Sequence, residues 1–493
     1  MGLFKYALLT TITVFGTAWA GVPVVKTEVA IIGAGAAGLE AADLLRQAGV
    51  DHVVLESEDH AGGRVSSRPD VDSMGLTLDE GANLINSIDK TVLRLLNGFE
   101  IPYIRRLPPG TDHMQYLING KHYTQGAAER LLFATNYLVL SQIAWDARLR
   151  DNGDVQRERW MVNTSIATYL KKSGADSAFI HLVDSFFWSE YGRRIEDLNL
   201  HVLFDYLGVD YEGQHFKFIP YFDEAFQVPG GLGQIVDRLE ARNHESIRYS
   251  HSVRSIVDAP NQTVLVTAQA PGGPVQIEAK QIIFAAPLHA LQSLNVEVAG
   301  ITPEMLNEAK NMTYARGVKM HLKFSKGFRG LYKFPGIFMT DSGEQIWLSS
   351  LGQDGDAGLL TVLTGPLLHH PLEERAFVER VLRQLEKIAP GVSKFYVSFE
   401  RTDASHSYSG AFRPGEVRDV RLNDIDLPNW FGVGEAPGGD FQGYLEGALL
   451  SAKERVSHWL SLRDLATQCE TGLHAKPAKK PGRSGIHARV MNY

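Results

Sequence analysis

Several features that define other protein classes are scarce in this chain of 493 residues. Its only cysteine, Cys469, excludes a disulfide bond within the chain. The formal net charge of −8 gives no sign of the basic surface that a nucleic-acid-binding protein needs. We find no transmembrane helix, no internal repeat and no set of metal ligands. The composition, 44% hydrophobic and 22% charged, is instead that of an ordinary globular protein with two or three domains.

The N-terminus has the pattern of a secretory signal peptide. Residues 1–20 carry a basic residue near their start, Lys5. A short apolar stretch follows and ends on Ala18-Trp19-Ala20. The apolar stretch is too short for a comfortable membrane span, although an uncleaved anchor is the alternative. We therefore expect a secreted protein, or one in the lumen of the secretory pathway.

Two further features bear on the surface of the protein. Sequons at Asn163, Asn261 and Asn311 are candidate glycosylation sites, although such triplets also arise by chance. Residues 470–493 are basic, contain glycine and proline, and have little apolar content. This composition predicts a disordered tail.

The most informative stretch is the glycine-rich segment 29–40. An apolar run leads into the glycines, a helix-forming stretch follows, and a second apolar run ends in Glu56, 18 residues after Gly38. This order is typical of a βαβ unit that binds a dinucleotide: the glycines allow a tight turn, a close approach to the pyrophosphate and close helix packing. The helix start offers unpaired N–H groups to the phosphates, and the acid can bind ribose hydroxyls. We assign to this cofactor the residues Gly33, Gly35, Ala37, Gly38 and Glu56.

An arginine lies just beyond the second predicted strand, in the run Gly62-Gly63-Arg64. Alone, this run would be an ordinary loop with a surface arginine. After a dinucleotide motif, the guanidinium is well placed to neutralise a pyrophosphate. The run resembles the second half of the nucleotide signature of the flavin-containing amine oxidase superfamily. Gly63 and Arg64 are therefore assigned to a flavin cofactor rather than to a nicotinamide.

A second glycine-rich loop lies near the C-terminus, in residues 429–449. A short apolar strand ends in Gly434-Glu435, and a helix begins at Gly443-Tyr444. A helix start can face the dipolar edge of a flavin, and a glutamate can accept hydrogen bonds from the ribityl chain. This segment resembles the last signature of the monoamine and polyamine oxidases. We assign Glu435, Gly443 and Tyr444 to the cofactor.

The resemblance to flavin-containing amine oxidases extends over residues 27–455 and implies a fold. It implies an α/β protein of two domains, with a Rossmann-like FAD-binding domain and an α+β substrate domain. The FAD-binding domain would be discontinuous, with segments 24–100, 228–300 and 415–460. The substrate-binding domain would comprise 101–227 and 301–414.

The same resemblance adds cofactor residues outside the two glycine-rich signatures. The loop Gly81, Ala82 and Asn83 would contact the flavin, and the backbone at Val253 would lie near the adenine. Ala411 stands where some relatives carry a cysteine attached to the flavin, so we expect non-covalent FAD.

Apolar spacing gives a coarse map of the remaining chain. Residues 126–206 have helical spacing, and 372–389 resemble an amphipathic helix. Residues 247–286 alternate as expected for antiparallel strands, and further strands are predicted in 316–325 and 346–364.

The family resemblance also points to catalytic residues. A family lysine that holds a water against flavin N5 corresponds to Lys319; the alternative is a lysine on the exposed face of an edge strand, as we expect for Lys323 and Lys326. Strand alternation puts Lys319 and Lys323 on one face, so alternation alone does not choose between them. Tyr444 and Phe412 would be the two rings that hold an amine before the flavin, although Phe412 fits a core position equally well.

The substrate pocket departs from the best-known members of the family. L-amino-acid oxidases place an arginine after the middle glycine loop, whereas this loop continues to Asn86 without one, which argues against an α-amino-acid substrate. The acid that plant-type polyamine oxidases carry there is also replaced by Asn86. Glu190 could bind a second amine of the substrate, or could pair with Arg193.

The resemblance implies an oxidase that transfers hydride from a small amine to flavin N5. Hydrolysis of the imine would follow, with reoxidation by oxygen giving hydrogen peroxide. Two alternatives stay open: a flavin desaturase or thioether oxidase on the same fold, and an FAD-stabilised secreted protein without catalysis. The sequence does not give the oligomeric state.

Overall fold

A computed structural model describes residues 24–108, 113–150, 154–210, 215–218, 223–334, 336–404, 412–416, 422 and 425–470. The predicted signal peptide, the tail beyond residue 470 and Ala411 lie outside these ranges. No helix among the described residues is long and apolar enough to cross a membrane.

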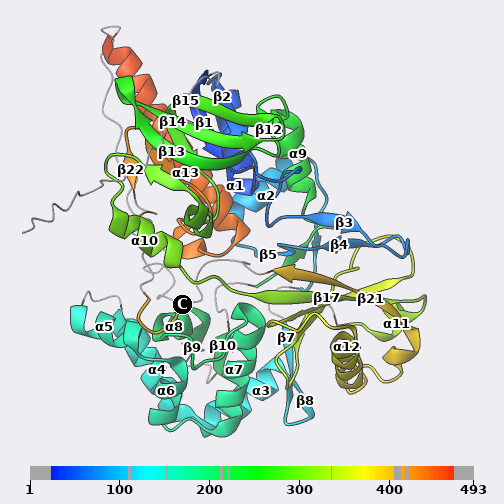
Figure 1. Ribbon diagram of the computed structural model, residues 1–493. Coiled ribbons are helices and arrows are strands. Elements are labelled where there is room, and N and C mark those ends of the chain that lie inside the picture. Colours follow the sequence, from blue (N-terminus) through cyan, green and yellow to red (C-terminus); the bar gives the residue numbers. More distant parts are fainter. Residues whose placement is uncertain are drawn as a thin grey trace, which may run out of the picture.

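The upper half of the molecule in Figure 1 is built on a nine-stranded sheet. Its parallel part has the order β12-β2-β1-β15-β23, and its antiparallel part continues from β15 through β14 and β13, with β16 at one edge. β22 pairs with β23. The strands are β1 (Val24–Ile32), β2 (His52–Leu55), β12 (Ile247–Arg248), β13 (Ser252–Ala259), β14 (Thr263–Ala270), β15 (Gly273–Phe284), β16 (Asn295–Glu297), β22 (Asp426–Leu427) and β23 (Trp430–Gly432).

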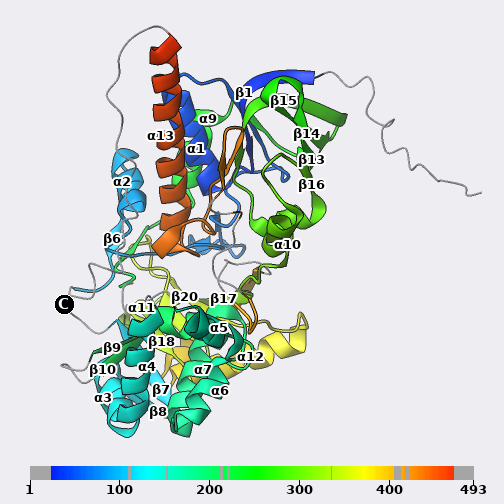
Figure 2. The ribbon, with the colours of Figure 1, turned by 90° about the vertical axis from the view of Figure 1, so that its left-hand side faces the viewer.

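The parallel part of this sheet is buried because helices cover it. The last four residues of β1 are all buried, as expected for a central parallel strand. α1 (Ala36–Gln47) packs against both α9 (Gln234–Asn243) and α13 (Leu445–Glu470), and Figure 2 shows α1 and α13 side by side. α2 (Lys90–Gly98) packs on α13. The βαβ unit predicted around the glycine-rich segment 29–40 is therefore confirmed as β1, α1 and β2.

One part of the strand prediction was wrong. Residues 247–286 were expected to be wholly antiparallel, but β12 runs parallel to β2 and the end of β15 runs parallel to β1. The reason is connectivity: β12 enters the sheet after the crossover helix α9, and such crossovers give parallel strands. β13, β14 and the first half of β15 are antiparallel as predicted.

The lower half contains a seven-stranded sheet in the order β21-β17-β20-β19-β18-β7-β8. α12 (Pro371–Leu385) covers one face through a shared apolar cluster that includes Val318, Met320 and Phe377. The strands are β7 (Met114–Ile118), β8 (Lys121–Thr124), β17 (Gly317–Phe324), β18 (Ile337–Met339), β19 (Gln345–Leu348), β20 (Gly358–Thr364) and β21 (Tyr396–Ala404). The short helix α11 (Phe328–Leu331) follows β17.

The predicted helical segment 126–206 is confirmed as a block of six helices beside this sheet (Figure 1). They are α3 (Gln125–Thr135), α4 (Tyr137–Arg150), α5 (Val155–Asn163), α6 (Ile166–Lys172), α7 (Ser177–Tyr191) and α8 (Leu200–Tyr206). Side chains accept N–H groups at the starts of four of them, the N-caps Asp154, Ser165, Asp176 and Asn199. The hairpin β9 (Leu207–Asp210) and β10 (His215–Phe218) follows α8.

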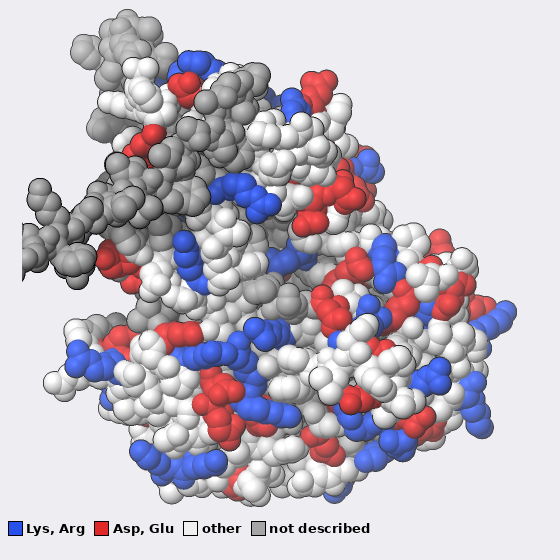
Figure 3. Space-filling model, in the orientation of Figure 1, with Lys and Arg blue, Asp and Glu red and all other residues white. Residues whose placement is uncertain are grey.

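Small elements connect the two halves. The hairpin of β3 (Ser67–Pro69) and β4 (Thr77–Asp79) reaches toward β17 and β21 (Figure 1). A three-stranded sheet joins β5 (Leu84–Ile85), β11 (Phe226–Gln227) and β6 (Ile104–Arg105), and α10 (Pro303–Asn311) lies near the junction. Acidic and basic side chains lie interspersed on the face of the molecule seen in Figure 3.

Candidate active site

The glycine-rich turn after β1 has the geometry that a pyrophosphate site requires. Gly33 has φ +107°, and a Cβ on Gly38 would lie 1.9 Å from the Gly33 carbonyl oxygen, so neither position admits a side chain without a shift. A Cβ on Gly35 would meet only open space. Gly35 is the N-cap of α1 and gives no side-chain cap, in contrast to the capped helices of the lower half. The N–H groups at the start of α1 can therefore donate hydrogen bonds to phosphate oxygens.

Glu56 ends β2 beside this turn. Its Oε2 accepts the Ala34 N–H at 2.7 Å, and its Oε1 accepts the Glu58 N–H at 3.0 Å. The Glu56 carbonyl oxygen accepts the His251 N–H at 2.7 Å, which brings the start of β13 close to the acid. Val253, in that strand, is buried and pairs with Ala268. Its contact with adenine stays a prediction, but it lies at the Glu56 end of the site.

The second glycine element touches the first. The Gly62 N–H donates to the Ala34 carbonyl at 2.9 Å, and a Cβ on Gly63 would lie 3.5 Å from the Gly35 Cα. Gly63 has φ +58°, in the left-handed region that favours glycine. The chain can therefore turn directly from the phosphate-facing glycines into Arg64.

Arg64 and Glu435 meet although 371 residues separate them. The Arg64 guanidinium donates to Glu435 Oε1 at 2.9 Å. Both line a pocket with residues from the end of β15 and the segment after it, from β23 and the loop after it, and with Leu422. These residues are Phe284, Ala285, Ala286, Pro287, Leu288, Leu422, Trp430, Gly432, Val433, Gly434, Ala436 and Pro437. The distant segments thus converge on one site, as predicted.

The Gly81 loop closes against Arg64 from the other side. The Ala82 N–H donates to the Arg64 carbonyl at 3.1 Å, and a Cβ on Gly81 would lie 1.8 Å from the same oxygen. Asn83 is held by its neighbours: its amide nitrogen donates to Asp79, and its Oδ1 accepts the Trp347 indole N–H at 2.7 Å. The Asn83 side chain therefore supports the loop, and a direct contact with the cofactor stays a prediction.

Lys319 reaches this loop from β17. Its Nζ donates to the carbonyls of Gly81 and, at 3.3 Å, of Asp79, and it lies 5.8 Å from the centre of the Trp347 ring. Burial lowers the pKa of Lys319 to about 8, although the carboxylates of Asp79 and Glu80 oppose this shift. The lysine is therefore part of the site and its charge is sensitive to its surroundings.

The exposed-edge alternative for these lysines was wrong for β17. The strand lies between β21 and β20, so it is not an edge. Lys323, expected on an exposed face, has no exposed side-chain surface and forms an ion pair with Glu400 at 2.7 Å. Carboxylates across the sheet, which sequence spacing does not reveal, make its burial tolerable. Lys326 is exposed as expected and pairs with Asp356 at 2.9 Å.

Tyr444 extends the site toward the helical block. The hydroxyls of Tyr444 and Tyr191 are both hydrogen-bonded to Tyr206 at the end of α8. The Tyr191 and Tyr206 rings pack edge to face, 5.4 Å apart. Gly443, with φ +89°, provides the turn into α13. Tyr444 therefore lies at the junction of the two halves.

Comparisons with known proteins decide the family. A model of the family described as flavin containing amine oxidoreductase matches residues 36–457. The chain belongs to this family. It is 23% identical over 485 residues to polyamine oxidase 3 of Oryza sativa subsp. japonica, covering 91% of this chain and 93% of that protein. It is 21% identical over 474 residues to the flavin-containing amine oxidase B of Mus musculus, covering 88% and 85%.

Solved structures show the same fold. A putrescine oxidase bound to putrescine aligns with a TM-score of 0.73 at 16% identity, covering 89% of this chain and 100% of that chain. The cyclohexylamine oxidase of Brevibacterium oxydans aligns with a TM-score of 0.71 at 18% identity, covering 89% and 99%. The protein is thus an FAD-dependent amine oxidoreductase with a Rossmann-like FAD-binding part, and the predicted fold class is confirmed.

Glu190 and Phe412 were predicted to lie beside the substrate, and the structure shows the contacts of each. Glu190 accepts a hydrogen bond from the Gln345 amide at 2.7 Å, and Gln345 also donates to Ser189. Phe412 is 3% exposed within the apolar core, and its carbonyl accepts the Asn199 N–H at 2.9 Å. This burial suits the core alternative for Phe412, and its place beside the substrate stays a prediction.

Sequence reasoning missed Glu224. Its N–H donates to Asn86 Oδ1 at 2.8 Å, so an acid stands in space beside the position where the loop lacks one. Glu224 Oε2 is buried without a hydrogen-bond partner among the described residues. Burial raises the pKa of Glu224 to about 7, Arg106 opposes the shift, and Glu190 adds to it. One hint of this acid is present in the sequence: Asn86 stands where the family resemblance leads us to expect a carboxylate.

The predicted glycosylation sites all lie on exposed residues, at Asn163, Asn261 and Asn311. Asn261 has φ +64° in a tight turn between β13 and β14. Exposure permits modification but does not test it, so glycosylation stays a prediction.

Proposed function

We propose that the protein oxidises a small amine that carries a second amino group. The oxidation itself is supported by the convergence of Lys319, Arg64 and Glu435 on one site, with Tyr444 at its border. The open space at Gly35, the uncapped start of α1 and the Arg64 guanidinium suit the pyrophosphate of FAD. When bound, FAD would accept a hydride at N5 and would be reoxidised by oxygen to give hydrogen peroxide.

The protein residues would supply position, charge and dryness. Lys319 can hold a water through its ammonium, because its pKa near 8 keeps it mostly protonated at neutral pH. That water would serve reoxidation and hydrolysis of the imine product. The aromatic ring of Tyr444 would lie beside the reacting amine, where an apolar surface favours the neutral form that can lose hydride.

Two carboxylates support a second amino group on the substrate. Glu190 and Glu224 are close enough for each to influence the other's charge, and Glu190 also influences the Tyr206 hydroxyl, which is bonded to Tyr444. A cation near these acids would relieve their mutual repulsion. The absence of an arginine after the Gly81 loop continues to argue against α-amino acids.

Two further points belong to the proposal. FAD would be bound without a covalent link, since Ala411 offers no sulfur to the flavin. The protein would act in the secretory pathway or outside the cell, because of the N-terminal signal pattern. FAD released by denaturation, and N-terminal sequencing of the secreted protein, test these points.

The decisive experiment is an anaerobic screen of flavin bleaching with monoamines, diamines, polyamines and amino acids. We expect diamines to bleach the bound flavin fastest and to release hydrogen peroxide when air is admitted. Bleaching by amino acids alone, or by none of the amines, would contradict the proposal.

A further inference from the structure

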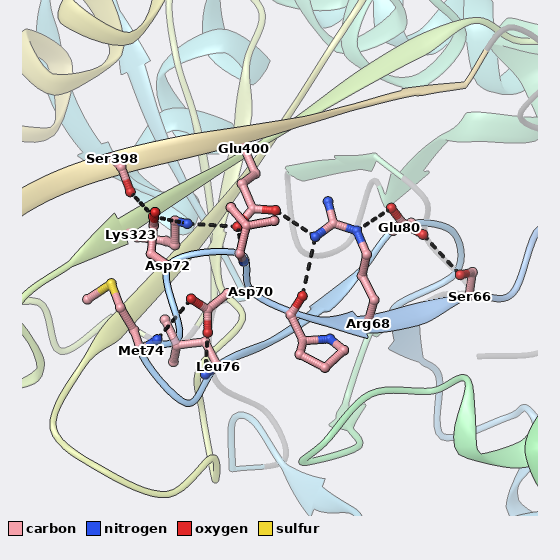
Figure 4. A network of polar contacts seen from close by, with 12 residues as sticks. Ser66, Arg68, Asp70, Asp72, Met74, Leu76, Glu80, Lys323, Ser398 and Glu400 are labelled. Atoms are coloured by element: carbon pink, nitrogen blue, oxygen red, sulfur yellow. Dashed lines mark hydrogen bonds and ion pairs between the residues drawn. The ribbon is translucent and has the colours of Figure 1, made fainter.

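A network of charged side chains surrounds the buried pair of Lys323 and Glu400 (Figure 4). Lys323 lies on the same strand as Lys319, β17. Val318, Met320 and Leu322 point into the apolar cluster under α12, so Lys319, His321 and Lys323 face the opposite way. Lys323 forms ion pairs with Glu400 on β21, at 2.7 Å, and with Asp72 in the turn of the β3–β4 hairpin. Although burial alone would lower it, these two carboxylates hold the pKa of Lys323 above its ordinary value.

Glu400 is the centre of this network. Its Oε1 accepts the Lys323 ammonium and, at 2.9 Å, the Val71 N–H, while its Oε2 accepts the Arg68 guanidinium at 2.6 Å. Three donors from a central strand, a hairpin strand and a hairpin turn therefore meet on one carboxylate. Their hydrogen bonds hold the pKa of Glu400 below its usual range even though burial would raise it.

Arg68 carries the network along the hairpin. Its Nε donates to Glu80 at 2.7 Å, and its Nη1 donates to Glu400. One guanidinium therefore joins β21 to the residue after β4. Asp70 closes the hairpin turn by accepting the Met74 and Leu76 N–H groups at 3.0 and 2.8 Å. The hairpin is thereby tied internally and to the seven-stranded sheet.

The residues that receive Lys319 follow directly from this hairpin. Asp79 ends β4, Glu80 is next, and Gly81 begins the loop against Arg64. The carbonyls of Asp79 and Gly81 accept the Lys319 ammonium. The Glu80 carboxylate, which Arg68 binds, favours the charged form of Lys319 and so opposes the lowering of its pKa by burial. A shift of the hairpin would therefore move the acceptors of Lys319.

The signs of the charges give a second consequence. Arg68 and Lys323 face three carboxylates, those of Asp72, Glu80 and Glu400, so these five side chains together carry one surplus negative charge. This surplus favours the protonated, positively charged form of the neighbouring Lys319. Loss of Arg68 would increase the negative charge near Lys319, and loss of Glu400 would decrease it.

We propose that Arg68, Lys323 and Glu400 are positioning residues for Lys319: they clamp the β3–β4 hairpin onto β17 and β21 and so fix the place and the charge of the ammonium. This inference rests on the proposed role of Lys319 in the oxidase. None of the three residues needs to contact substrate or cofactor for this purpose.

Few other titratable groups face Lys319 among the described residues. Asp79 and Glu80 come from the end of β4. On β21, Thr402 lies opposite Lys319, and Glu400 lies opposite His321, two residues along the strand. On its own strand Lys319 has Lys323 and His321, whose pKa burial lowers to about 3, so His321 is neutral. The neighbouring strand β20 places Leu363 opposite Lys319, and β19 contributes Trp347.

The test compares Arg68→Gln and Glu400→Gln in the FAD-loaded protein. The first readout is the pH dependence of acetylation of Lys319 by acetic anhydride, followed by mass spectrometry, which reports the ionisation of Lys319 without any turnover. We expect the midpoint to rise by about 0.5 to 1 pH unit in Arg68→Gln and to fall by a similar amount in Glu400→Gln. Opposite shifts that follow the sign of the removed charge are expected from a charge effect, whereas loosening of the hairpin alone gives no reason for this correlation.

The chain offers a matched control on the same strand. Arg401, next to Glu400, forms an ion pair with Glu374 of α12 at 2.7 Å on the other face of the sheet. Glu374→Gln breaks a comparable pair away from the hairpin and should leave the Lys319 midpoint unchanged. Hydrogen exchange of residues 70–83 should accelerate in Glu400→Gln but not in Glu374→Gln.

A conservative variant covers the case in which a glutamine variant fails to fold. Arg68→Lys keeps the charge but cannot join Glu80 and Glu400 at once, so exchange in residues 70–83 should rise while the Lys319 midpoint stays. Unchanged midpoints and unchanged exchange in the variants that fold would overturn the inference. Amine-dependent bleaching by the wild-type protein is measured in parallel, so that failure of the proposed function is recognised separately.

Discussion

The two sheets of this molecule hold their functional groups by different means. On the nine-stranded side, the site consists largely of backbone: the turn at Gly33, the open position at Gly35 and the bare start of α1. On the seven-stranded side, it consists of side chains from separate strands, such as Lys319 and Trp347. The first kind of site is local in sequence and intolerant of added atoms. The second kind depends on charge pairs between residues far apart in the sequence. We therefore expect single substitutions there to have smaller effects.

The sharpest contrast lies within the glycine-rich turn itself. Gly38→Val would drive a side chain into the Gly33 carbonyl, so we expect a loss of about 4 kcal/mol or more in unfolding free energy and no bound FAD. A Cβ at Gly35 would meet no protein atom within 4 Å, so Gly35→Val should keep the fold while losing FAD. Thermal unfolding and FAD content measure both effects. Equal stability of the two variants would contradict the backbone account.

Arg64 tests the meeting point of the two glycine-rich signatures. Arg64→Ala would leave Glu435 buried without its cation and would remove a charge from the pyrophosphate site. We expect FAD to bind about 10²-fold more weakly, equivalent to roughly 3 kcal/mol, as measured by fluorescence titration of the apoprotein. Arg46→Ala, which removes an arginine at the other end of α1 that is paired with Asp43, is the control and should bind FAD normally. An unchanged affinity in Arg64→Ala would remove this arginine from the site.

Lys319 tests the side-chain half of the comparison. Lys319→Met should retain FAD, because the lysine touches the Gly81 loop rather than the phosphate-facing glycines. Flavin reoxidation should slow on the order of 10²-fold in stopped-flow measurements, since no ammonium would hold the water. Lys326→Met, on the same segment but exposed, should behave as wild type. Wild-type reoxidation in Lys319→Met would contradict the assignment.

The smallest expected effect concerns the two neighbouring acids Glu190 and Glu224. Glu190→Gln and Glu224→Gln should each raise the KM for a diamine about 10-fold, equivalent to about 1.4 kcal/mol, with little change for a monoamine. Glu224 gains its charge as the pH rises through about 7, so the wild-type KM for a diamine should be higher below that pH than above it. Glu224→Gln should lack this inflection. Equal effects on monoamines and diamines would exclude a second-amine site here.

Much of the cofactor site could be predicted because its determinants are close together in sequence. Gly33, Gly38 and Glu56 fall within one βαβ unit. Each glycine is required for steric reasons, and the spacing of the glycines in the sequence is enough to predict this. The antiparallel reading of residues 247–286 failed at β12 because strand direction depends on the crossover through α9.

The substrate side was harder to predict because its determinants are long-range. Lys323 is buried only because Glu400, 77 residues later, and Asp72 reach it across the sheet. Glu224 takes a position beside Asn86 through a backbone hydrogen bond that spans 138 residues. Neither pairing leaves a local pattern in the sequence.

Denaturing the purified protein and quantifying the released FAD shows whether separated segments of this chain bind one FAD between the glycine-rich turn and the Arg64–Glu435 pair. We expect one FAD per wild-type chain, recovered in solution without a covalent attachment. A colourless protein that takes up no FAD after careful reconstitution would refute this binding site.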